Sequence, residues 1–222
     1  MKIKICGQTS VKDADMSLDH GADFIGAVMD VDWSPRSLNE KQIRPIFAAQ
    51  RERAFLLTFN AEITPALEKT IESLDPYAIQ LTGRETFETV AFIKSVTSRL
   101  IFKSIHLFPA DGEKASDPEM ILRLMDGYSK AGADGFVLDT AVKGMYGGTG
   151  VTNDWSIAAM IAKSAPGPVF LAGGINPENV VEASGVPYIY GIDLASGVES
   201  AKGVKSGEKL ISLFGAINKT LA

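Results

Sequence analysis

The sequence is poor in the residues that build covalent cross-links and metal sites. One cysteine, Cys6, and two histidines, His20 and His106, stand among 222 residues. A single cysteine cannot form an internal disulfide, and two isolated histidines do not give the ligand spacing of a metal site. The sequence therefore predicts no metal, and a metal-dependent hydrolase is disfavoured.

Long apolar runs and an excess of positive charge are also missing. No apolar run approaches the roughly 20 residues of a membrane helix, and the N-terminus runs straight into a strand pattern without room for a signal peptide. The net charge of −5 argues against a nucleic-acid or anionic membrane surface. We expect a soluble cytoplasmic protein, monomer or homodimer, with no nucleic-acid and no membrane partner and with a small-molecule ligand.

Two nucleotide-binding signatures are absent. A dinucleotide-binding sheet would carry Gly-x-Gly-x-x-Gly after its first strand, but that turn reads Cys6-Gly7-Gln8-Thr9. A Gly-Lys-Ser/Thr phosphate loop occurs nowhere in the chain. A nicotinamide enzyme is therefore disfavoured.

What the chain does have is a regular alternation of short strand-like and longer helical runs. The predicted strands are Lys2–Ile5, Phe24–Met29, Ala54–Phe59, Ala78–Leu81, Leu100–Ile105, Gly135–Leu138, Pro168–Ala172 and Tyr188–Leu194. The predicted helices are Val11–Asp19, Glu40–Ala49, Pro65–Ser73, Thr86–Val96, Pro118–Ala131, Trp155–Lys163, Pro177–Glu182 and Gly207–Asn218. Eight units of about 28 residues, with polar and glycine-rich turns after several strands, predict a single-domain (β/α)8 TIM barrel over residues 1–222 rather than an open doubly wound sheet.

A short motif that occurs twice in the chain fits this barrel. Gly21-Ala22-Asp23 and Gly132-Ala133-Asp134 stand half a chain length apart, each before a predicted strand. Four strand–helix units separate them, so the two turns would lie across the barrel from each other. A half-barrel repeat would explain the repeated motif, and so would common glycine chemistry at the end of a helix.

Two rim positions could carry acid–base chemistry, because barrels place their active sites at the carboxyl ends of the strands. Cys6 ends the first strand and shares the inward face with Lys4, whose ammonium would favour the thiolate. Asp139 ends the sixth strand, where burial could raise its pKa for acid work. The plainer alternatives are an inert buried cysteine and a loop-ordering or capping aspartate.

Two consecutive glycine turns suggest a phosphate site. An apolar strand runs into Gly173 and Gly174, after which Asn176 could cap and Pro177 could begin a helix. One strand later, Ser196 and Gly197 form another turn. Loops after the seventh and eighth strands of barrels commonly bind phosphate through exposed amides at helix starts.

Two further segments stand at the predicted rim. The Tyr146–Gly150 loop, which contains Gly148, is glycine-dense and suited to folding over a ligand. Arg36, after the second strand, could hold a carboxylate through two hydrogen bonds, although an isolated arginine is more commonly a solvated one.

Taken together, these segments resemble phosphoribosylanthranilate isomerase, an enzyme family of tryptophan biosynthesis. The matching stretches occur in the family's order from residue 4 to residue 199: Lys4-Ile5-Cys6-Gly7-Gln8-Thr9, Gly21-Ala22-Asp23, Ser34-Pro35-Arg36, Ile79-Gln80-Leu81, Leu138-Asp139-Thr140, Gly147-Gly148-Thr149-Gly150, Asp154-Trp155, Leu171-Ala172-Gly173-Gly174, Pro177-Glu178-Asn179-Val180 and Asp193 through Glu199. The combination is specific, although other phosphate-binding barrels share the glycine turns.

The resemblance implies an Amadori rearrangement of N-(5-phosphoribosyl)anthranilate to 1-(2-carboxyphenylamino)-1-deoxyribulose 5-phosphate, without a cofactor. Asp139 would be the general acid and Cys6 the general base. Arg36 would bind the anthranilate carboxylate, and Asp193 would contact the sugar hydroxyls. Gln80 and Thr82 would be further substrate-binding residues, and the phosphate would be held around Gly148, Gly173, Gly174, Ser196 and Gly197.

Several residues depart from the family pattern. The family usually has histidine where this chain has Thr82, and Ala27, Asn153 and Ala195 replace a common phenylalanine, phenylalanine and serine. The stretch before Arg36 contains Asp30 and Asp32, which would weaken anthranilate binding if either paired with the arginine. Two alternatives follow: a related isomerase that acts on another sugar phosphate, and a non-catalytic barrel that binds a phosphate ligand.

Overall fold

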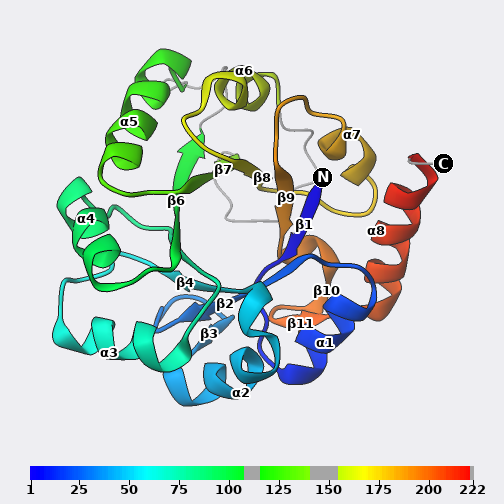
Figure 1. Ribbon diagram of the computed structural model, residues 1–222. Coiled ribbons are helices and arrows are strands. Elements are labelled where there is room, and N and C mark those ends of the chain that lie inside the picture. The colour runs from blue at the N-terminus through cyan, green and yellow to red at the C-terminus, as the bar shows by residue number, and fades with distance from the viewer. Residues whose placement is uncertain (108–115, 141–154, 221–222) are drawn as a thin grey trace.

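Eight parallel strands form a closed barrel in the computed structural model, which describes residues 1–107, 116–140 and 155–220. The barrel strands are β1 (Lys2–Ile5), β2 (Phe24–Met29), β4 (Ala54–Thr58), β5 (Ala78–Leu81), β6 (Leu100–Leu107), β7 (Gly135–Thr140), β8 (Val169–Ala172) and β9 (Gly191–Leu194). Each strand pairs with the next along the chain, and β9 pairs with β1, which closes the ring (Figure 1). The predicted (β/α)8 fold is therefore confirmed.

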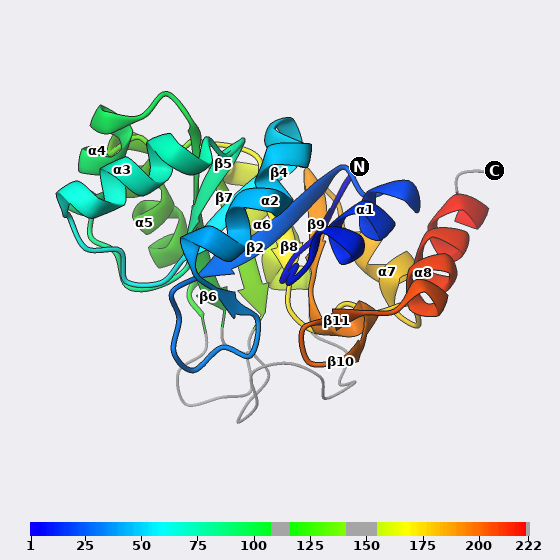
Figure 2. The same ribbon diagram turned by 90° about the horizontal axis from the view of Figure 1, so that it is seen from below.

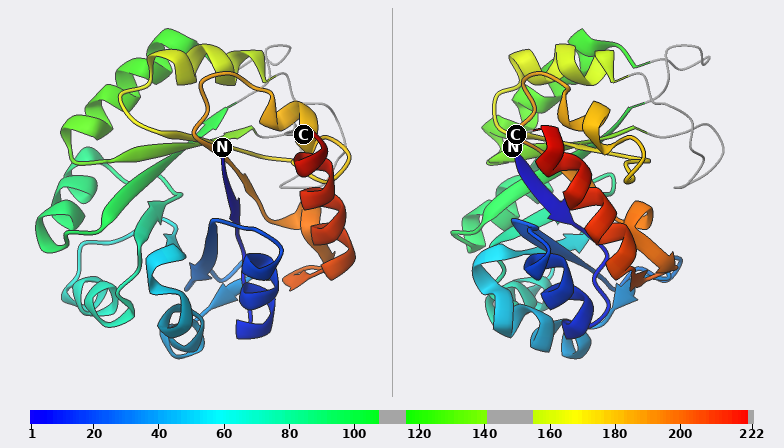
Figure 3. Two further views of the ribbon diagram at one scale, coloured as in Figure 1. Left: turned by 45° about the vertical axis from the view of Figure 1, so that its right-hand side comes forward. Right: turned by 90° about the vertical axis from the view of Figure 1, so that its right-hand side faces the viewer.

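The helices surround this barrel. They are α1 (Val11–Asp19), α2 (Glu40–Gln50), α3 (Pro65–Leu74), α4 (Phe87–Val96), α5 (Pro118–Lys130), α6 (Ser156–Ser164), α7 (Val180–Ser184) and α8 (Gly207–Thr220). The short additional elements are β3 (Ser37–Leu38), η1 (Arg51–Arg53), η2 (Ser196–Val198), β10 (Glu199–Ala201) and β11 (Val204–Lys205). The last helix, α8, packs against α7 and α1 and so completes the outer layer (Figure 3). Among the described residues, no helix has both the length and the apolar character needed to cross a membrane.

Most element boundaries agree with the prediction to within two residues, and two differ more. The last barrel strand begins at Gly191 rather than Tyr188, because Tyr188 has a φ of 68°, in the left-handed region that a strand does not use. Helix α7 begins at Val180 rather than Pro177. The Asn176 side chain accepts hydrogen bonds from the amides of Glu178 and Asn179 instead, and this turn delays the helix.

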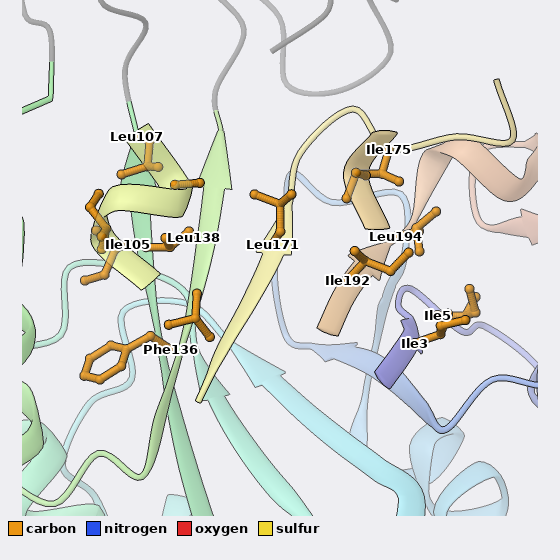
Figure 4. Packing of buried hydrophobic residues seen from close by; sticks show 14 of the residues in the cluster. Ile3, Ile5, Ile105, Leu107, Phe136, Leu138, Leu171, Ile175, Ile192 and Leu194 are labelled. Atoms are coloured by element: carbon orange, nitrogen blue, oxygen red, sulfur yellow. The ribbon is translucent and has the colours of Figure 1, made fainter. Parts of the chain in front are cut away.

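Alternate residues of the strands build two separate layers of packing. Ile3 and Ile5 belong to the large cluster between the barrel and the helices, together with outward residues of β6, β7, β8 and β9 (Figure 4). Inside the barrel, Phe55, Phe102 and Phe170 pack against one another with ring centroids 5.2–6.1 Å apart. The strand alternation thus points Lys4 and Cys6 inward, as the sequence predicted.

The repeated Gly-Ala-Asp turns have the same local structure on opposite sides of the barrel. Gly21 and Gly132 have φ values of 117° and 109°. Asp23 accepts a hydrogen bond from the Ile3 amide, and Asp134 accepts one from the Ile101 amide, each at 2.8 Å. The turns precede β2 and β7, which are four strands apart in the ring. A half-barrel repeat predicts this arrangement, and the shared local chemistry also suffices to explain it.

Candidate active site

Lys4 on β1 is a fully buried cation inside the barrel. Its side chain is 0% exposed, its Nζ lies 2.7 Å from Asp193 Oδ2, and the ammonium lies 5.2 Å from the centre of the Phe55 ring. Burial lowers the pKa of Lys4, but the charges of Asp193 and Cys6 outweigh it and hold this pKa above its usual value. Lys4 and Asp193 therefore form a fixed ion pair beneath the mouth of the barrel.

Cys6 directly follows β1 at the mouth of the barrel and is 6% exposed. Its amide donates a hydrogen bond to the Leu194 carbonyl at 2.7 Å. Gly26 on β2 leaves room for the thiol, because a Cβ at that position would lie 2.9 Å from Cys6 Sγ. Burial raises the pKa of Cys6, and the lowering by Lys4 and Lys205 is too small to reverse it. The expectation that Lys4 would favour the thiolate is right in direction, but desolvation outweighs that effect here.

Arg36 is held in place by a carboxylate that the sequence did not single out. Its Nε and Nη2 donate to the two carboxylate oxygens of Glu199, each at 2.7 Å. The guanidinium stem lies against Gly7, where an added Cβ would come within 2.5 Å of Arg36 Cδ. Among the described residues, no hydrogen bond or ion pair joins Asp30 or Asp32 to Arg36; both aspartates are exposed.

Glu199 and Lys205 belong to the β10–β11 hairpin, which lies at one end of the barrel (Figure 2). Lys205 Nζ lies 3.0 Å from Glu199 Oε1 and donates to the Cys6 carbonyl at 2.5 Å. Burial raises the pKa of Glu199, but the hydrogen bonds from Arg36 and Lys205 outweigh it and hold this pKa below its usual value. The hairpin therefore links the end of β1, through Lys205, to the loop that carries Arg36, through Glu199.

A single row of the sheet brings the predicted acidic residues together. Paired positions across β6, β7, β8, β9 and β1 are, in order, His106, Asp139, Ala172, Asp193 and Lys4. Paired residues of parallel strands face the same side, so these side chains share the interior face of the barrel. The row thus carries a carboxylate on each side of a small alanine, and each carboxylate has a basic partner on its outer side.

Asp139 and Asp193 differ in their access to solvent. The Asp193 side chain is 7% exposed and the Asp139 side chain is 40% exposed. The nearest basic group to Asp139 is His106, whose Nδ1 lies 3.6 Å from Asp139 Oδ2. The charge of Asp139 also reaches Asp193. Of the two carboxylates, Asp139 is therefore the more accessible from the mouth of the barrel.

Gln80 lies on β5 and Thr82 directly follows it. Strand β5 pairs with β6 on the side away from β7, so these two residues continue the barrel wall beyond His106. Gln80 donates a hydrogen bond to the Ser104 hydroxyl at 3.1 Å, and Ser104 Oγ lies 3.5 Å from Thr82 Oγ1. Both predicted residues are buried. Gln80 pairs with Phe102 of the interior cluster and Thr82 contacts Ser104, so both face the barrel interior. A chain of neutral polar groups therefore lines the wall from β5 to β6.

The two glycine turns after β8 and β9 lie side by side. Gly173 and Gly174 have φ values of 94° and 67°, which only glycine adopts without strain. A Cβ at Gly197 would lie 2.0 Å from the Ile175 carbonyl oxygen, so the second turn packs directly on the first. Ser196 begins the 3-10 turn η2 beside them. Gly148, also predicted to bind phosphate, lies outside the described residues.

The predicted helix start in this region is wrong, and the phosphate argument changes with it. Helix α7 has only five residues, and its N-cap, Asn179, makes no capping hydrogen bond with its side chain. Asn179 Nδ2 donates instead to the Gly174 carbonyl at 3.1 Å. Any anion here would therefore be held by turn amides rather than by a long helix.

Comparison with known proteins decides among the barrel families that share such turns. The family model described as N-(5′-phosphoribosyl)anthranilate (PRA) isomerase matches residues 3–216. The chain belongs to the PRA isomerase family. An N-(5′-phosphoribosyl)anthranilate isomerase of Natronomonas pharaonis is 32% identical over 94% of this chain and 91% of its own. One of Geotalea daltonii is 36% identical over 94% of this chain and 92% of its own.

Solved structures agree with this assignment. The crystal structure of phosphoribosyl anthranilate isomerase from Thermus thermophilus superimposes with a TM-score of 0.77, at 28% identity over 99% of this chain and 100% of that one. The protein is thus an isomerase of the type used in tryptophan biosynthesis, as the sequence resemblance implied. No group of three or more possible metal-ligating side chains occurs among the described residues.

The departures from the PRA isomerase pattern fall in different places. Ala27 and Met29 belong to the cluster that packs against α2, outside the barrel, and do not face the site. Thr82 does face the interior. Trp33 is 69% exposed on the rim and packs edge-on against Phe59, with ring centroids 5.9 Å apart. Ala195 directly precedes Ser196 in the turn after β9, and Asn153 lies outside the described residues. Among the described departures, those at Thr82, at Ala195 and in the stretch before Arg36 therefore lie near the predicted substrate site.

Proposed function

We propose that this PRA isomerase family member converts N-(5′-phosphoribosyl)anthranilate into 1-(2-carboxyphenylamino)-1-deoxyribulose 5-phosphate by acid–base catalysis, with Asp139 as the acid and Cys6 as the base. The observation that carries the assignment is the pairing row that places Asp139 at the interior mouth, two strands from the buried Lys4–Asp193 pair beneath Cys6. Cys6 directly follows β1 and Asp139 is the last but one residue of β7, so both lie at the carboxyl ends of barrel strands, where barrel enzymes place their catalytic groups.

The reaction begins at the ribose ring oxygen. The Asp139 carboxyl gives its proton to that oxygen, the C1′–O bond breaks, and the nitrogen lone pair forms a C1′=N iminium ion, the protonated Schiff base. Cys6 then removes the C2′ proton, and the electrons of that C–H bond form an enolamine. Tautomerisation of the enolamine gives the ketose. These two proton transfers lead to the enolamine, in which C1′ then gains a proton and the C2′ hydroxyl loses one. Solvent exchange returns a proton to Asp139 and removes one from Cys6, so the isomerisation needs no oxidant, reductant or cofactor.

Substrate binding is assigned to the groups around these two residues. Arg36 would hold the anthranilate carboxylate with Nη1, which has no partner among the described residues, while Glu199 fixes the other edge of the guanidinium. The aromatic ring would lie on the rim near Trp33 and Phe59. Asp193 would accept hydrogen bonds from sugar hydroxyls, Gln80 and Thr82 would complete the wall, and amides around Gly173, Gly174, Ser196 and Gly197 would hold the phosphate.

Turnover by the purified protein tests this proposal, followed as the loss of anthranilate-ester fluorescence. Cys6→Ala and Asp139→Asn should each lower kcat/KM by at least about 10²-fold. Asp126→Asn is the matched control, since Asp126 is exposed on α5 with 56% of its side chain accessible. Full activity in either site variant would refute the assigned roles.

A second candidate is the same rearrangement on a sugar phosphate with a different amine. Thr82 favours it, because this interior position usually carries a histidine in the family. Here it carries a buried hydroxyl that accepts a hydrogen bond from Ser104 Oγ at 3.5 Å. Growth of a tryptophan auxotroph that lacks this isomerase separates the two candidates. Rescue by the cloned chain supports anthranilate as the aglycone, and failure together with intact folding supports the other amine.

A further inference from the structure

His106 points into the barrel beside the proposed acid. Ile105 and Leu107, its neighbours on β6, lie in the outer hydrophobic layer, as does Leu138 beside Asp139 (Figure 4). Because successive strand residues face opposite sides, His106 and Asp139 both face inward. They are direct register partners on neighbouring strands. Their closeness is therefore fixed by the sheet and not by a surface loop.

The hydrogen bonding of the imidazole determines which nitrogen faces Asp139. Nε2 of His106 lies 3.0 Å from the Thr82 carbonyl oxygen. A carbonyl can only accept, so Nε2 carries a hydrogen and donates it. Nδ1 is then the nitrogen that gains or loses a proton, and it lies 3.6 Å from Asp139 Oδ2. A proton on Nδ1 faces the carboxylate directly.

The charges around His106 favour this proton. Asp139 raises the pKa of His106, burial opposes it, and the Thr82 carbonyl adds to the rise, so the net pKa lies above its usual value. Lys103, also on β6, lowers it, but Lys103 is itself paired with Glu85 at 3.1 Å. On the far side of Asp139, the next charged groups in the row are Asp193 and Lys4, which neutralise each other.

We propose that His106 is the proton-holding partner of Asp139, so that the two side chains act as one acid in the isomerisation. The proposal rests on the proposed function above. A free aspartic acid has lost its proton at neutral pH, whereas a general acid must hold one. In the pair, the single proton rests on Nδ1 of the imidazolium, passes to the Asp139 carboxylate and from there to the ring oxygen, which leaves His106 neutral. His106 is a positioning residue in this scheme, since Asp139 alone touches the substrate.

The proposal makes a specific prediction for the pH profile. The active form needs Cys6 as a thiolate and the Asp139–His106 pair with its proton. Because the pKa of Cys6 and that of His106 are both raised, kcat/KM should rise with pH while thiolate forms, then level off once the pair begins to lose its proton. A carboxylic acid gives up its proton at lower pH than an imidazolium. Removing the imidazole should therefore move the levelling-off point to lower pH and lower the plateau.

His106→Gln tests this, because its amide can still donate to the Thr82 carbonyl but cannot be protonated. We expect kcat/KM at neutral pH to fall about 10²-fold and the acid limb of the profile to shift to lower pH. His20→Gln is the matched control, since the chain has only these two histidines and His20 contacts the Met16 carbonyl in α1. It should leave the profile unchanged.

A second measurement needs no substrate. In the His20→Gln background, the single remaining histidine can be titrated by NMR of its ring C–H signals. We expect Asp139→Asn to lower the pKa of His106, because it removes the carboxylate. An unchanged titration would overturn the pairing, even if His106→Gln failed to fold.

The outcomes separate this inference from the proposed function. If the wild type turns over the substrate and His106→Gln keeps full activity with an unshifted pH profile, the inference is overturned and the proposed function stands. Lack of turnover by the folded wild type overturns the proposed function, and the catalytic role of His106 with it. Turnover by the wild type, with a lowered and shifted profile in the variant and a lowered pKa of His106 in Asp139→Asn, supports both.

Discussion

The two sides of the barrel mouth each pair a carboxylate with a base, but in opposite environments. On one side, Lys4 and Asp193 are 0% and 7% exposed and 2.7 Å apart. On the other, His106 and Asp139 are 37% and 40% exposed and 3.6 Å apart. A buried, close pair keeps its charges fixed, whereas a looser and wetter pair can pass a proton to a ligand. The difference suggests a division of labour between electrostatic support and proton transfer.

The largest expected effect that tests this comparison is on stability. Lys4→Met leaves the Asp193 carboxylate buried without its partner and should lower the free energy of unfolding by about 3–5 kcal/mol. His106→Gln should cost about 1 kcal/mol or less, since its pair is more than one-third exposed. Urea denaturation monitored by circular dichroism measures both. Equal losses in the two variants would contradict the comparison, and adding Asp193→Asn to Lys4→Met should recover part of the loss.

A smaller effect concerns the chemical reactivity of Cys6, which lies on the side of the buried Lys4–Asp193 pair. Burial raises its pKa, so the thiolate forms only as the pH rises toward and beyond that raised value. Alkylation by iodoacetamide at pH 7 should be slower than that of free cysteine and should accelerate about tenfold per pH unit. Mass spectrometry gives the rate directly, because the chain has one cysteine. A rate already independent of pH at neutrality would show that Lys4 and Lys205 prevail over burial.

The smallest effect is expected at Arg36, which belongs to neither pair. Glu199→Gln removes the charge that fixes its guanidinium, so the grip on the substrate carboxylate should loosen. We expect KM to rise about tenfold with a smaller change in kcat, measured by steady-state turnover. Glu72→Gln, at an exposed position on α3, is the control and should change neither constant. A fall in kcat alone would instead link Glu199 to the proton transfer assigned to the His106–Asp139 pair.

The sequence predicted the parts of this site that depend on local patterns. Period-2 alternation was enough to place Lys4 and Cys6 on the inner face, and the order of strands was enough to bring Asp139 to the rim. Strand β6 was expected to end at Ile105, which left His106 in a loop, although it continues to Leu107 by pairing with β7. The polar character of His106 hid its strand position, because a barrel mouth accepts polar inward residues that a closed core does not.

The partners of these residues could not be predicted, since each comes from a distant part of the chain. Glu199 meets Arg36 across 163 residues, and Lys205 meets the Cys6 carbonyl across 199. No local pattern distinguishes these two charged residues from solvated ones. The expected influence of Lys4 on Cys6 was right in sign, but the extent of burial depends on the packed barrel and not on the spacing of two residues.

The β10–β11 hairpin has a consequence for the order in which this protein matures. Lys4, Arg36 and Cys6 are synthesised before their partners Asp193, Glu199 and Lys205, which follow 163 to 199 residues later in the chain. A nascent chain can form many of its strands and helices while its first functional residues still lack their electrostatic support. These contacts are therefore complete only after Lys205 has been synthesised, and loss of the β10–β11 hairpin should disturb the surroundings of both Cys6 and Arg36.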